Sequence, residues 1–83
     1  MNAPTILSKA PSQVLASVGL ALLRVKTARH ITLEDMGTVL GRTREMVSQY
    51  IAGEAEMGMV AWLRANAAWP ELAEKLAEAE KQS

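Results

Sequence analysis

The chain has 83 residues, of which 49 % are hydrophobic and 22 % are charged, and its formal net charge is zero. This length suits one small domain, and this balance excludes both a disordered polar chain and a membrane protein. Cysteine is absent, which excludes disulfides, a zinc–thiolate site and thiol catalysis. Phenylalanine is also absent, and Ala, Leu, Met and Val predominate without the alternation typical of strands, so the composition indicates an all-α fold.

The zero net charge hides an uneven distribution of charged residues. Residues 1–50 carry six basic and three acidic side chains, for a net charge of +3, and residues 51–83 carry three basic and six acidic ones, for a net charge of −3. A surface that binds phosphate needs an excess of basic side chains. We therefore expect any phosphate contacts in the first part of the chain.

The chain begins with residues 1–11, which include two prolines and lack hydrophobic periodicity, so we predict a flexible N-terminal arm there and one domain over residues 12–83. The apolar run over residues 14–23 is about half of the roughly 20 residues that a bilayer requires. No cleavage pattern follows this run, so we expect a cytoplasmic protein. Apolar residues at helical spacing predict a helix over residues 12–28 with Ser12 as N-cap (Val14, Val18, Ala21, Leu22 and Val25).

A second, short helix is predicted over residues 33–40. Thr32 and Asp35 have the spacing of a capping box, in which each side chain bonds to the other's backbone amide. Gly41 follows the last apolar residue and is typical of a left-handed residue that ends a helix. His30, just before this helix, has no second histidine, cysteine or suitably spaced carboxylate to complete a metal site, so we interpret it as a surface or helix-end residue.

A third helix follows, with Thr43 as its N-cap and Gly53 at its end. One side of this helix is apolar (Val47, Tyr50 and Ile51). The other side is polar, at positions i, i+1, i+4 and i+5 (Arg44, Glu45, Ser48 and Gln49). Taken alone, such a polar side is the solvated face of an ordinary amphipathic helix.

Two further helices complete the chain. We predict a fourth over residues 57–67 that buries some of Met59, Val60 and Leu63, and a fifth that Pro70 opens at its first position. The fifth has a thin apolar edge and a supporting pair of charges one turn apart (Leu72, Leu76 and Ala79; Glu71 and Lys75). Four large side chains are expected either in the core or at a dimer surface, with neither alternative preferred (Met57, Met59, Trp62 and Trp69). The fold class is thus a compact all-α bundle of about five short helices.

Residues 32–53 resemble the helix-turn-helix unit of the Cro/cI-type family, also called lambda-repressor-like or XRE-type. The resemblance covers about half of the chain and is carried by six positions in the two helices and their turn (Met36, Gly37, Leu40, Gly41, Val47 and Tyr50). Ile51 stands where the family often has a glutamate that pairs with an arginine of the first helix, so apolar packing is expected there instead. The resemblance implies a helix-turn-helix DNA-binding domain within the five-helix bundle.

The resemblance also implies a set of DNA contacts. In the family, the polar side of the third helix faces base edges in the major groove, which assigns base contacts to Arg44, Glu45, Ser48 and Gln49. Contacts to phosphates are assigned to residues at the helix starts and in the turn (Thr32, Arg42 and Thr43). No catalytic residue, metal site, cofactor or small-molecule ligand is indicated, so we do not expect an enzyme.

The function implied is a sequence-specific, double-stranded DNA-binding transcriptional regulator of bacterial or phage origin. Repression by occupancy as a homodimer on the nucleoid is the simplest mechanism. The alternative is a protein-interaction module of the same fold without DNA binding, such as an antirepressor, an antitoxin or a phage assembly factor. Zero net charge and two acidic residues after the third helix, Glu54 and Glu56, favour that alternative.

Overall fold

The computed structural model describes residues 10–81, which form five α-helices. The helices are α1 (Pro11–Arg29), α2 (Leu33–Leu40), α3 (Arg44–Ala52), α4 (Met59–Ala68) and α5 (Leu72–Lys81). No strand occurs within this part of the chain, and the predicted all-α bundle of five short helices is confirmed. Most of the predicted N-terminal arm, residues 1–9, lies outside the described residues.

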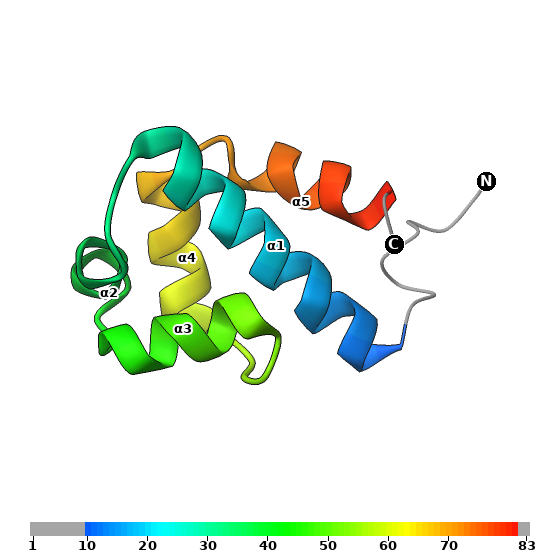
Figure 1. Ribbon diagram of the computed structural model, residues 1–83, viewed down its shortest axis with the longest axis horizontal. Coiled ribbons are helices and arrows are strands. Elements are labelled where there is room, and N and C mark those ends of the chain that lie inside the picture. The colour runs from blue at the N-terminus through cyan, green and yellow to red at the C-terminus, as the bar shows by residue number, and fades with distance from the viewer. Residues whose placement is uncertain (1–9, 82–83) are drawn as a thin grey trace.

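Helix α1 runs through the middle of the bundle (Figure 1). It contacts α3 on one side and α5 on the other, while α2 contacts α3 and α4. The crossing of α1 and α3 is close, because a Cβ atom on Gly19 would lie 2.7 Å from the carbonyl oxygen of Tyr50. The turn after α3 also touches α1, since a Cβ atom on Gly53 would lie 3.3 Å from the Cα atom of Ala16. Small residues on α1 therefore set the position of α3.

The predicted N-cap of the first helix is wrong. Helix α1 begins at Pro11, and the cap position is Ala10, whose backbone amide donates to the side-chain oxygen of Gln13 at 2.9 Å. Pro11 suits the first position because its fixed φ is helical and an amide there would have no helical acceptor. At the other end His30 is exposed and takes a left-handed conformation with φ of 55°, which confirms it as a helix-end residue.

Helices α2 and α3 begin and end where the sequence predicts. Thr32 Oγ1 accepts from the amide of Asp35 at 3.0 Å, and the carboxylate of Asp35 accepts from the amide of Thr32 at 2.9 Å, so the capping box is confirmed. Thr43 Oγ1 accepts from the amide of Met46 at 3.2 Å and caps α3. Gly41 and Gly53 end the two helices with φ of 70° and 75°, which glycine adopts at little cost.

One hydrophobic core joins all five elements. Its fully buried members come from every helix and from the turn before α5 (Ala21, Leu22, Val25, Met36, Leu40, Val47, Tyr50, Ala61, Ala65, Trp69 and Leu72). Ile51 is half-buried against this core, as expected from its apolar side chain. Val14 and Val18 are only half-buried, because they line an apolar hollow of about 400 Å³ together with Trp62 and Leu76.

The prediction for the fourth helix is wrong in its buried face. Met59, Val60 and Leu63 are exposed, and the buried side of α4 consists of Ala61 and Ala65. Alanines allow the backbone of α4 to approach the core closely, whereas the larger residues point outward. Three other large residues were expected either in the core or at a dimer surface. Of these, Trp69 is buried, and Met57 and Trp62 are half-buried.

Helix α5 begins at Leu72 and not at Pro70, because Pro70 and Glu71 form a turn in which the amide of Leu72 donates to the carbonyl of Trp69 at 2.9 Å. The predicted partner of Glu71, Lys75, does help to lower the pKa of Glu71 through its charge, but the closest partner of this carboxylate is Arg29. The Glu71 carboxylate accepts two hydrogen bonds from the Arg29 guanidinium, at 2.5 and 2.9 Å. Leu72 and Ala79 are buried and Leu76 is half-buried, which confirms the predicted apolar edge. In residues 10–81 no helix has the length and apolar character needed to cross a membrane.

Candidate nucleic-acid interface

Helices α2 and α3 are joined by a three-residue turn that Gly37 and Gly41 make possible. A Cβ atom on Gly37 would lie 2.5 Å from the carbonyl oxygen of Arg42, so only glycine lets the turn lie against α2. Gly41 supplies the left-handed conformation at which α2 ends. Met36, Leu40, Val47 and Tyr50 are buried in the same cluster, which fixes how α3 packs on α2.

The polar side of α3 is exposed along its length. Arg44, Glu45, Ser48 and Gln49 are all exposed, while Val47 and Tyr50 on the opposite side are buried. All four candidate base-contacting residues therefore lie on one accessible helix face. Leu33, at the first position of α2, is half-buried against the core and does not belong to this polar surface.

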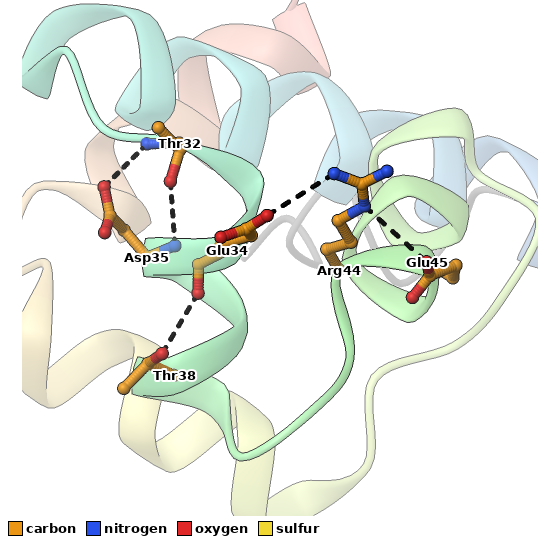
Figure 2. Close-up of polar contacts among 6 residues, drawn as sticks. All are labelled: Thr32, Glu34, Asp35, Thr38, Arg44 and Glu45. Atoms are coloured by element: carbon orange, nitrogen blue, oxygen red, sulfur yellow. Dashed lines mark hydrogen bonds and ion pairs between the residues drawn. The ribbon is translucent and has the colours of Figure 1, made fainter.

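Arg44 has two acidic partners in the free protein (Figure 2). Its Nη1 atom lies 3.4 Å from Glu34 Oε1 on α2, and its Nε atom lies 3.6 Å from Glu45 Oε1 on the neighbouring position of α3. The side chains of Arg44 and Glu34 are 61 % and 74 % exposed, so solvent screens this pair strongly. The guanidinium is thus held over the start of α2 by contacts that a competing anion can replace.

The three candidate phosphate-contacting residues are also exposed (Thr32, Arg42 and Thr43). The hydroxyl oxygens of Thr32 and Thr43 accept the capping hydrogen bonds, and each hydroxyl retains its proton to donate outward. The side chain of Arg42 folds back onto the backbone, and its Nη1 atom donates to the carbonyl oxygen of Gly41 at 3.2 Å. The start of α2 favours negative charge, and the hydrogen bond from the Thr32 amide holds the pKa of Asp35 below its usual value.

A second hollow, of about 390 Å³, lies next to this surface. It is lined by residues from the end of α1, the start of α2 and the start of α3 (Lys26, Thr32, Leu33, Glu34 and Arg44). Lys26 and Glu34 were not among the predicted site residues. Lys26 lies in the last turn of α1. A basic residue six positions before Thr32 was the only feature of the sequence that could have suggested its place beside the site. From the sequence, Glu34 was interpreted only as an acidic residue that favours the start of a helix. Its contact with Arg44 could not be predicted, because it depends on how α2 and α3 pack.

No cluster of three or more acidic or histidine side chains suited to a metal ion occurs within residues 10–81. Comparisons of the chain with protein-family models, with curated proteins and with solved structures find no significant match. The candidate interface is therefore defined by its own geometry: an exposed polar helix face, flanked by two helix starts and two cationic side chains.

Proposed function

We propose that this protein is a sequence-specific, double-stranded DNA-binding transcriptional regulator that acts as a homodimer. In this proposal α2 and α3 are a helix-turn-helix unit, α3 lies in the major groove, and occupancy of an operator on the nucleoid represses transcription. The observation that carries the proposal is the exposed face of α3, on which Arg44 and Gln49 are accessible together. These residue types pair with guanine and adenine through two hydrogen bonds each.

Base contacts are tested by substitution on this face. Arg44→Ala and Gln49→Ala are each expected to reduce discrimination between the preferred and a mismatched base pair by about 1–3 kcal/mol. Both side chains are exposed, so the circular dichroism spectrum is expected to stay unchanged. Lys81→Ala is the matched control, because it removes an exposed positive charge at the end of α5 and should leave base preference unaltered. Preferred duplexes are first selected from random sequence.

A protein-interaction module without DNA binding is the second candidate function. The observation that favours it is the acidic segment directly after α3, in which Glu54 and Glu56 are both exposed. Carboxylates at that place repel the phosphate backbone. The two candidates differ in their response to salt: a DNA-binding regulator loses affinity for duplex steeply as salt rises, whereas the module has almost none at low or high salt. Lack of binding at low salt would refute the regulator.

A further inference from the structure

Two arginine side chains from different parts of the chain lie against the turn between α2 and α3. Arg42, in the turn, donates from Nη1 to the carbonyl oxygen of Gly41 at 3.2 Å, and its Nη2 atom lies 3.8 Å from where a Cβ atom on Gly58 would be. Arg64, in α4, places its Nη1 atom 2.5 Å from where a Cβ atom on Gly41 would be. The packing of α4 against α2 therefore brings a second guanidinium to the turn, although Arg64 lies outside residues 32–53.

These two arginines lack the acidic partners that the other arginines of residues 10–81 have. Arg24, Arg29 and Arg44 each lie within 4.0 Å of a glutamate oxygen. Arg42 and Arg64 are both exposed, and neither has an ion pair with any residue of that range. Two positive charges beside one turn repel each other, and an anion between them would turn that repulsion into attraction. The free protein thus holds two cations that no carboxylate of the described chain neutralises.

The donors of the two guanidinium groups suit a phosphate group. Within residues 10–81, Arg64 donates no hydrogen bond, and Arg42 donates only the one to Gly41. A guanidinium is a planar fork of N–H donors that matches the oxygens of a phosphate through paired hydrogen bonds. A phosphate also presents oxygens on several sides, so it can accept from two forks at once. The pair stands next to Thr43, whose hydroxyl is a candidate phosphate contact.

We propose that Arg64 is a phosphate-contacting residue, and that Arg42 and Arg64 together hold one phosphate group at the turn. The inference deepens the proposed function and rests on it for the source of the phosphate, which is the backbone of the bound duplex. The alternative source is a free phosphate ion. A contact of this kind carries no base information, so its role is to fix the position of α3 on the duplex.

The first part of the test is duplex binding by the full chain at several salt concentrations. Arg64→Ala is expected to weaken binding about ten-fold at low salt, equally for preferred and mismatched duplexes. The slope of log K against log salt should fall by about 1, because one phosphate contact is lost. Arg64→Lys keeps the charge and should keep the slope. Lys81→Ala is the matched control, since it removes the same charge at the far end of α5 and should leave the slope unchanged (Figure 1).

The second part uses inorganic phosphate without DNA. Phosphate is expected to shift the NMR signals of the Nε–H groups of Arg42 and Arg64 together, and chloride at equal ionic strength should not. In Arg64→Ala, the shift at Arg42 should be mostly lost. Arg64 is exposed and has no hydrogen bond to residues 10–81, so the free energy of unfolding of this variant should match that of the wild type.

The two parts separate this inference from the proposed function. If the chain binds duplex and Arg64→Ala leaves the salt slope unchanged, the inference is overturned and the proposed function stands. If the chain binds no duplex but phosphate shifts both arginine signals, only the proposed function fails, and the pair takes a free phosphate ion. A chain that responds to neither duplex nor phosphate refutes both.

Discussion

At the residue scale, Arg44 shows how the candidate site is prepared in the free protein. The sequence places this side chain on an outward helix face, and the structure adds that Glu34 and Glu45 lie against it. An exposed ion pair of this kind contributes about 0–1 kcal/mol. The pair therefore orients the guanidinium but can be broken at little cost when another partner is available. In the proposed function, Arg44 must exchange Glu34 for a base edge when the protein binds DNA.

Glu34→Gln is therefore expected to raise affinity for duplex DNA. The gain should reach at most about five-fold, which corresponds to the upper range for an exposed ion pair. The variant also removes a negative charge near the phosphates, so the measurement needs a control with the same change in net charge. Glu74→Gln, at an exposed position of α5, provides this control and should alter the affinity for duplex less than Glu34→Gln does. Equilibrium fluorescence anisotropy with labelled duplex gives both values, and an unchanged or lower affinity of Glu34→Gln would contradict the role assigned to Glu34.

At the scale of the helices, local signals and tertiary contacts determine different features. The capping box at Thr32, the cap at Thr43 and the glycines after α2 and α3 are local, and the sequence predicted both helices from them correctly. The close crossing of α1 and α3 depends instead on Gly19, for which the sequence pattern predicted no special role. The sequence shows only an isolated glycine within a predicted helix. The close approach of α3 to α1 explains why glycine stands at this position.

Gly19→Ala is expected to destabilise the fold by about 1–3 kcal/mol, the usual cost of overpacking. The added methyl group would meet the backbone carbonyls of Tyr50 and Ile51, which cannot rotate away as a side chain does. In an exposed helix the same change would stabilise by about 1 kcal/mol through helix propensity. Ala28→Gly, at an exposed position of α1, calibrates that propensity effect. Urea denaturation followed by circular dichroism gives the free energy of unfolding of both variants and of the wild type. A Gly19→Ala variant more stable than the wild type would contradict the close crossing of α1 and α3.

At the scale of the whole molecule, the ion pair of Arg29 and Glu71 joins distant parts of the chain at short range. Arg29 at the end of α1 and Glu71 in the turn before α5 form two hydrogen bonds although they are 42 residues apart. The bonds from the Arg29 side chain are the largest cause that lowers the pKa of Glu71 from 4.5 to about 2. Because the folded pKa is below the unfolded one, this pair stabilises the fold above about pH 4.5 and its contribution is lost as the pH falls toward 2.

Glu71→Gln should consequently be less stable than the wild type at neutral pH, and the difference should shrink between pH 4.5 and pH 2. Free energies of unfolding from urea titrations at several pH values give this difference. Glu74→Gln is the control for the loss of a carboxylate in the same region. A difference that stays constant over this pH range would show that the Glu71 carboxylate is not held by Arg29.

The sequence by itself determined the number of helices, the limits of α2 and α3 and the polar face of α3. These follow from interactions within a few residues, such as caps, left-handed glycines and helical periodicity. Only the tertiary structure decided which side of α4 is buried, that Glu71 pairs with Arg29 and that Glu34 lies against Arg44. In α4 apolar residues lie on both sides, so periodicity gives no preference, and the small size of Ala61 and Ala65 decides which side can approach the core.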